Sequence, residues 1–136
     1  MDITVNTLIS APIATVWNFY TQADHIVNWN AASDDWHTTR ASVDLRVGGQ
    51  FSSRMEAKDS SMGFDFAGTY TDVIVNHRID YQFGERKATV LFDETEGGVS
   101  VTVKFEAETV YPPEQQQQGW QAILNNFKRY TEETKA

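Results

Sequence analysis

Apolar residues in the last stretch of the chain recur at steps of three and four positions. They are Trp120, Ile123, Leu124, Phe127 and Tyr130. This spacing places them on one face of an α-helix, which we predict to run from Pro112 to Ala136. Prolines suit the start of a helix, because first-turn amides have no intrahelical partner in any case. A helix of this length spans about 30 Å, which is enough to lie across a whole small sheet.

Alternation of polar and apolar residues indicates β-strands from about residue 34 to residue 108. In the clearest strand Val99, Val101 and Val103 face one side, and polar residues face the other. Further strands are expected at residues 2–10, 50–57, 63–75, 78–83 and 87–95, with glycine turns at 47–49, 83–85 and 96–98. One face of this sheet needs a cover, and only the C-terminal helix is long enough to provide it.

Two short segments after the first strand keep helical spacing. Pro12 suits a first helical turn, and the apolar residues that follow it belong to a helix that reaches Tyr20. A second helix is expected to start with Asp24 as its N-cap and to carry Ile26 and Trp29 on its apolar face. The chain therefore reads as a strand, two short helices, several antiparallel strands and a long helix.

Motifs spread along the whole chain carry a resemblance to a known group of proteins. They are Ser10-Ala11-Pro12 with Val16-Trp17, then Ile26 and Trp29, Asp44-Leu45-Arg46-Val47-Gly48-Gly49 with Phe51, Gly68 and Tyr70, Arg78-Ile79 and Tyr81, and Gly119-Trp120 with Leu124. In this order they resemble the helix-grip START/Bet v 1-like (SRPBCC) superfamily, which also includes polyketide cyclase-like proteins. Within it the chain is most similar to the branch named after the activator of Hsp90 ATPase.

The resemblance implies an α+β helix-grip fold. A curved antiparallel sheet of about six or seven strands is then expected to wrap around the long C-terminal helix. The two short helices after the first strand are expected to close one end. Residues 1–136 are predicted to form a single domain of this type, a length that suits one hydrophobic core.

Charge and composition narrow the choice of partners. The formal net charge is −8, from 19 acidic and 11 basic residues, and no basic run occurs along the chain. Such a field repels phosphate groups, so neither nucleic acid nor a membrane is expected as a partner. No leader-like or long apolar segment is seen, and there are no cysteines. We therefore expect a cytoplasmic protein.

Candidate catalytic and metal-binding patterns are weak. His25, His37 and His77 lie in different predicted elements without the close spacing typical of zinc ligands, so no metal site and no cofactor are expected. Asp35 and His37 could share one face of a strand and form an acid–base pair, but solvated charges are the favoured interpretation. No nucleophile motif is present, so the protein is more simply interpreted as a binding protein than as an enzyme.

Aromatic residues on the predicted sheet and helices could fill a solid core or line a pocket. A slight preference for a pocket comes from Gly119, because glycine inside a helix costs about 1 kcal/mol relative to alanine. The predicted lining residues are Trp29, Trp36, Phe51, Phe66, Tyr70, Tyr81, Phe83, Gly119, Trp120, Ile123 and Leu124. Arg54 and Asp65 are expected to form a surface ion pair across two strands, or to act as polar groups inside the cavity if the faces are inverted.

Three functions are compatible with these features. The first is binding of a small apolar or amphipathic ligand between the sheet and the C-terminal helix. The second, implied by the resemblance, is regulation of an Hsp90-type chaperone as a protein partner. The better-known co-chaperones of that branch carry an additional N-terminal domain that these residues do not contain, so ligand binding is our first expectation. The third is a cyclase- or hydrolase-like enzyme that uses polar residues of the cavity.

Overall fold

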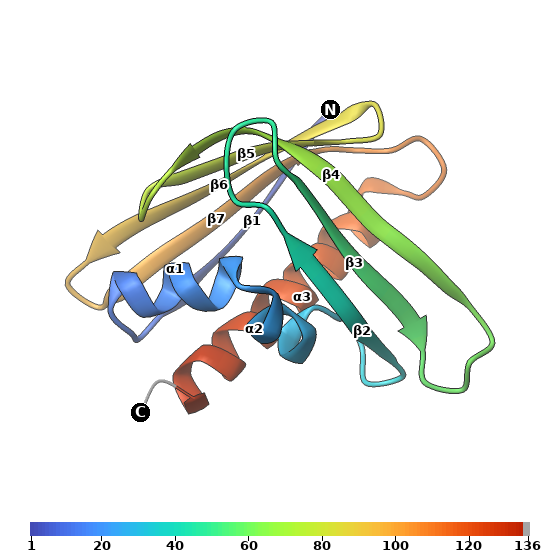
Figure 1. The fold of residues 1–136 in the computed structure, drawn as a ribbon, viewed down its shortest axis with the longest axis horizontal. Coiled ribbons are helices and arrows are strands. Elements are labelled where there is room, and N and C mark those ends of the chain that lie inside the picture. Colours follow the sequence, from blue (N-terminus) through green and yellow to red (C-terminus); the bar gives the residue numbers. More distant parts are fainter. Residues whose placement is uncertain (135–136) are drawn as a thin grey trace.

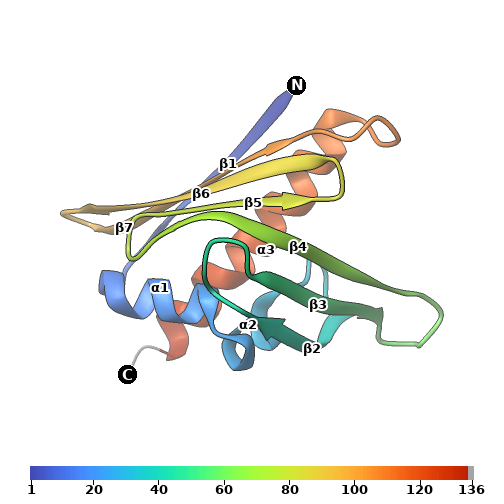
Figure 2. The same cartoon turned by 45° about the horizontal axis from the view of Figure 1, so that its top comes forward.

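Seven strands and three helices make up the computed structural model, which describes residues 1–134. The elements are β1 (Asp2–Ile9), α1 (Ile13–Thr21), α2 (Ala23–Trp29), β2 (Trp36–Val43), β3 (Gln50–Ala57), β4 (Gly63–Ile74), β5 (Arg78–Phe83), β6 (Arg86–Thr95), β7 (Gly98–Glu106) and α3 (Pro113–Thr134). All strand pairs are antiparallel, in the order β1-β7-β6-β5-β4-β3-β2. The sheet curls over α3, and α1 and α2 lie on the same side (Figure 1; Figure 2). This arrangement confirms the predicted helix-grip fold.

The strand pattern agrees closely with the alternation in the sequence. On β7 the inward residues Val99, Val101 and Val103 are all buried. The predicted turns are present, and Gly48, Gly84 and Gly98 adopt φ angles of 83°, 62° and 136°, which side-chain-bearing residues rarely adopt. The strand that the sequence did not delimit is β2, which pairs with β3 through a bulge near Thr39.

The helix boundaries differ slightly from expectation. The second helix begins at Ala23, and Gln22 rather than Asp24 is its N-cap. Gln22 also ends α1 in an extended conformation, so one residue serves as the joint between both helices. Asp24 therefore lies inside the first turn of α2, where a negative charge still suits the helix dipole. The last two residues of the predicted C-terminal helix lie outside the described part of the chain.

Helix α3 is attached to the edge of the sheet as well as to its inner face. The Gln121 side chain accepts a hydrogen bond from the Asn6 amide at 3.3 Å and donates one to the Asn6 carbonyl at 3.0 Å. The Lys128 ammonium donates to the Leu8 carbonyl further along β1. These contacts satisfy main-chain groups that an edge strand would otherwise expose to other chains.

Two of the three helices pack against the edges of the sheet, while α1 contacts the interior strands β6 and β7. Helix α3 lies along β1, and α2 lies along β2. The strands between these edges therefore arch over the helices, and only side chains fill the space beneath them. How well those side chains fill it differs from one half of the sheet to the other.

Candidate functional site

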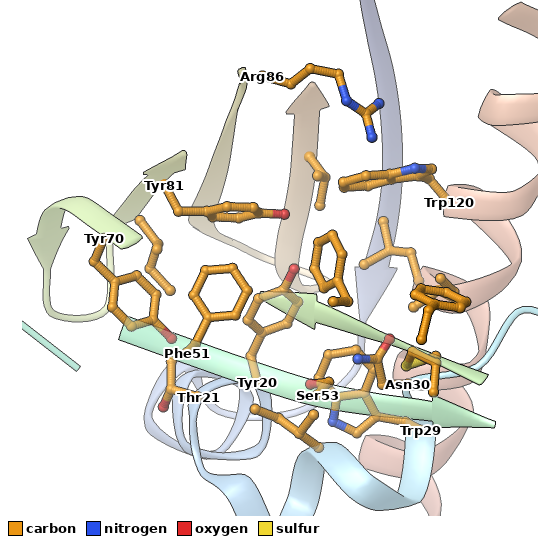
Figure 3. Close-up of a pocket in the computed structure, with 18 residues that line it drawn as sticks. Tyr20, Thr21, Trp29, Asn30, Phe51, Ser53, Tyr70, Tyr81, Arg86 and Trp120 are labelled. Atoms are coloured by element: carbon orange, nitrogen blue, oxygen red, sulfur yellow. The ribbon is translucent and has the colours of Figure 1, made fainter. Parts of the chain in front are cut away.

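A cavity of about 320 Å³ lies between the concave face of the sheet and the helices (Figure 3). Its walls come from α1, α2, the strands β3 to β7 and α3. The lining residues are Tyr20, Thr21, Ile26, Trp29, Asn30, Phe51, Ser53, Met55, Phe64, Phe66, Tyr70, Ile79, Tyr81, Arg86, Val103, Trp120, Ile123 and Leu124. Phe64 is 50% exposed although it lines the cavity, which places it at the rim.

Packing between aromatic rings shapes the wall formed by the sheet. The Phe51 ring lies 5.0 Å from the Tyr81 ring and 5.2 Å from the Tyr70 ring, measured between centroids. It can lie there because its cross-strand neighbour is Gly68, where a Cβ atom would come within 2.8 Å of the Phe51 ring. A glycine on the interior strand β4 thus makes room for an aromatic side chain of the cavity wall.

The helical wall is held by Trp120. Its ring stacks on Phe105 with a centroid distance of 3.9 Å and an interplanar angle of 11°. Phe105 is fully buried on β7, so the Trp120 ring is fixed to the core on one side. Its edge also approaches Phe66 at a centroid distance of 6.2 Å. This contact joins α3 to the wall formed by the sheet.

Most of the predicted lining residues line the cavity. Those that do are Trp29, Phe51, Phe66, Tyr70, Tyr81, Trp120, Ile123 and Leu124. Three others do not, namely Trp36, Phe83 and Gly119.

Phe83 lies beside the cavity, on the same face of β5 as Tyr81. It is buried, and its ring sits 5.6 Å from Phe66 and 5.8 Å from Trp120, measured between centroids. Trp36, at the start of the edge strand β2, lines a separate hollow of about 260 Å³ between α2, β2 and the end of α3. Alternation along a strand identifies the buried face, but it does not say which member of that face borders empty space.

Gly119 was expected to border the cavity, and this expectation was wrong. A Cβ atom placed there would meet nothing within 4 Å, and the residue does not line the cavity. Its neighbour Trp120 does line it, because one residue along an α-helix turns the side chain by about 100°. The glycine therefore provides neither a close approach to the sheet nor space for a ligand.

Arg54 and Asp65 lie on the convex face of the sheet and outside the cavity. They are direct cross-strand partners, and their side chains form an ion pair at 3.5 Å. Arg54 also contacts Glu56 at 3.0 Å on the same face. They are therefore not polar groups of the cavity, and because Asp65 is well exposed the pair contributes little to stability.

Several residues that line the cavity were not predicted from the sequence. Tyr20 continues the apolar stripe of α1, and Ser53 and Met55 alternate with Phe51 on β3, so a signal existed for each. Arg86 directly follows a turn and gave no signal. Its guanidinium donates to the Glu106 carbonyl at 3.2 Å and lies 4.5 Å above the centroid of the Phe83 ring.

Electrostatics in the cavity centre on three tyrosines. Burial raises the pKa of Tyr20 and of Tyr81 well above the ordinary value. Burial, together with the nearby Asp44 carboxylate, raises the pKa of Tyr70 to about 12. All three hydroxyls are therefore protonated at neutral pH. Among the described residues that line the cavity, Arg86 alone carries a formal charge.

The acid–base candidates from the sequence do not meet in a site. Asp35 accepts a hydrogen bond from the Ser33 hydroxyl, while His37 is exposed and pairs across the sheet with Glu56. His25 contacts the Tyr130 hydroxyl at 2.6 Å. Within residues 1–134 no group of three or more potential metal ligands is found, and no helix is long and apolar enough to cross a membrane.

Comparisons with known proteins agree with this architecture. Residues 10–132 match the family described as "Activator of Hsp90 ATPase homolog 1-like protein". The AHSA1-like protein from Aeromonas hydrophila is 48% identical, with a TM-score of 0.93 over 98% of this chain and 93% of that one. A protein from Cytophaga hutchinsonii is 42% identical, with a TM-score of 0.80 over 97% and 91%.

More distant structures share the fold alone. A protein from Chromobacterium violaceum is 24% identical and has a TM-score of 0.86, with 97% of this chain and 98% of that chain covered. Among curated proteins no match is found.

Proposed function

The chain belongs to the family of activator of Hsp90 ATPase homolog 1-like proteins, and we propose that it binds a small apolar or amphipathic molecule between the sheet and α3. The observation that carries the proposal is the aromatic-lined cavity of about 320 Å³. Small-molecule sites in proteins are concave, mostly apolar and of roughly 300–1,000 Å³. An occupant of the cavity would contact rings from all sides, which supplies most of the binding free energy by removing apolar surface from water.

The lining also favours binding over acid–base catalysis. Among its described residues there is no carboxylate or imidazole, and the three tyrosines have raised pKa values. A tyrosine with a raised pKa stays protonated at neutral pH, so it can donate a hydrogen bond but cannot act as a general base. The chemistry present suits recognition of a ligand.

Uptake of a neutral fluorescent probe tests the proposal. N-phenyl-1-naphthylamine is expected to bind the native protein with increased fluorescence. Ser53 faces the cavity, so Ser53→Phe is expected to fill part of it and to weaken probe binding about tenfold or more. Ser52 does not line the cavity, so Ser52→Phe on the same strand is the matched control and should bind the probe as the wild type does. No uptake by the folded wild type, shown by circular dichroism, would overturn the proposal.

Regulation of an Hsp90-type chaperone is a second candidate, favoured by the family match over residues 10–132. In this case the protein would raise the ATPase rate of such a chaperone in a concentration-dependent way. A steady-state ATPase assay with increasing protein checks this, with Ser53→Phe as a comparison. An increase retained in that variant would assign the effect to the outer surface, and an unchanged rate at saturating protein would exclude the candidate.

A further inference from the structure

Three hydroxyl groups in the cavity have no protein partner. They belong to Tyr20 on α1, Tyr70 on β4 and Tyr81 on β5. Within residues 1–134 no side chain or main-chain group forms a hydrogen bond with any of them. By contrast, the hydroxyl of Tyr130, which lies outside the cavity, bonds to His25 at 2.6 Å. Polar groups inside proteins are normally paired, so three hydroxyls without a protein partner in one cavity are donors available to a ligand.

Two of these three rings, Tyr20 and Tyr81, are held in place by their packing against other rings. Tyr20 lies edge to face with Phe127 at 5.0 Å and with Phe92 at 5.5 Å, measured between centroids. Tyr81 lies edge to face with Phe51 at 5.0 Å and packs in a tilted arrangement against Phe83 at 5.6 Å. Figure 3 shows the hydroxyl ends of Tyr20 and Tyr81 directed toward the same part of the cavity. Rigid donors lose little entropy when they bind a ligand, which favours binding and specificity.

The surroundings of these hydroxyls disfavour negative charge. Burial is the main cause of the raised pKa of each tyrosine, and neighbouring tyrosines add to it for Tyr20 and Tyr81. The same desolvation would act on a carboxylate placed beside them. An oxygen that accepts a hydrogen bond without carrying a charge fits better.

The charge of Arg86 does not change this conclusion. Its guanidinium lies over the Phe83 ring, donates to the Glu106 carbonyl, and faces the Glu108 carboxylate at 3.9 Å. These partners already balance its charge, so the cavity does not need an anion to neutralise it.

We propose that the cavity selects an uncharged, largely aromatic or aliphatic molecule that carries a carbonyl or similar acceptor oxygen, held by the hydroxyl groups of Tyr20 and Tyr81. This inference rests on the proposed ligand-binding function and adds the chemical class of the ligand. A pure hydrocarbon of the same shape fills the cavity but leaves both donors unpaired. An anion of similar shape pairs with the donors but loses its hydration.

Three probes of related shape test this proposal, namely benzophenone, diphenylmethane and diphenylacetate. Binding at pH 7 is measured from the indole N–H signals of Trp29 and Trp120 in NMR titrations, since both side chains line the cavity. Benzophenone is expected to bind at least about tenfold more tightly than diphenylmethane, and diphenylacetate more weakly than benzophenone. In a Tyr20→Phe, Tyr81→Phe double variant the preference for benzophenone over diphenylmethane should disappear, while diphenylmethane still binds.

Tyr111 is exposed and outside the cavity, so Tyr111→Phe is the matched control and should keep the full preference. Thermal unfolding identifies any variant that is no longer folded, and each single Tyr→Phe variant then replaces the double one. Equal affinity for the ketone and the hydrocarbon, or tightest binding by the carboxylate, overturns the inference and leaves the proposed function intact. If none of the three probes binds, the proposed function fails and the inference fails with it.

Discussion

The two halves of the concave face of the sheet contain the same kinds of residue but are packed differently. Under β6, β7 and β1 the side chains of Phe92, Phe127, Val101 and Ile9 are at most 2% exposed, and none of them lines the cavity. Under β3, β4 and β5 the rings of Phe51 and Phe66 are only partly buried, although they pack against the same core. Aromatic content therefore does not decide between core and cavity. The decisive factor is how near a helix lies to each strand.

The location of the helices accounts for the difference. Helix α3 lies along β1, and α1 contacts β6 and β7, so side chains from both layers interdigitate there. The middle strands β3 to β5 have no such backbone neighbour, and their side chains reach across a wider gap. We call the region under β6, β7 and β1 the closed half and the region under β3 to β5 the open half. Mutations in the closed half are expected to affect mainly stability, and mutations in the open half mainly ligand uptake.

The largest difference between the two halves is expected when an aromatic ring is truncated to alanine. Phe127 is completely buried in the closed half, so Phe127→Ala is expected to cost about 3–5 kcal/mol of unfolding free energy. Phe66 lines the cavity and is partly exposed, so Phe66→Ala should cost only roughly 1 kcal/mol. Urea unfolding measures both values. Equal losses would show that the two halves are packed alike.

Alkaline pH should lower the stability of the protein by deprotonating Tyr70 in the open half. The pKa of Tyr70 is about 12 in the folded protein, above its ordinary value, so the folded state holds this proton more tightly than the unfolded state does. Its contribution to stability is therefore fully present below pH 10 and is lost as the pH rises through about 12, roughly 2–3 kcal/mol in all.

Denaturant unfolding from pH 8 to pH 12 measures this loss. Tyr70→Phe should make the decline of stability above pH 10 less steep, whereas the exposed Tyr111→Phe should decline as the wild type does. The same slope in all three proteins would contradict the effect.

Two glycines give the smallest and most specific contrast. At Gly68 a new Cβ atom would approach the Gln82 carbonyl at 2.5 Å and the Phe51 ring at 2.8 Å, so Gly68→Ala should destabilise the protein by roughly 1–3 kcal/mol. Gly119 has open space around it within α3, so Gly119→Ala should stabilise the protein by up to about 1 kcal/mol. Thermal unfolding measures both changes, and probe uptake should be unaffected by Gly119→Ala. A loss of uptake in that variant would show that Gly119 is part of the cavity wall.

Local sequence patterns predicted much of the fold and part of the site. Alternation on β7 identified its buried face, and helical spacing brought Trp120, Ile123 and Leu124 onto the inner face of α3. The same patterns could not separate Tyr81, which borders the cavity, from Phe83, which lies further along the same face of β5 and does not. Periodicity reports which way a side chain points, and it does not report the distance to the layer opposite.

The order of the elements, the glycine turns and the inward-facing residues were already determined by the sequence, because each depends on neighbours within a few positions of the chain. The cavity was decided only by the tertiary structure, since it exists where α3 and α2 hold the two edges of the sheet and leave its middle uncovered. Tyr70 and Tyr81 are cross-strand partners on β4 and β5, whereas Tyr20 comes from α1, far away along the chain. Their shared lack of hydrogen-bond partners arises from that long-range arrangement, which no local pattern records.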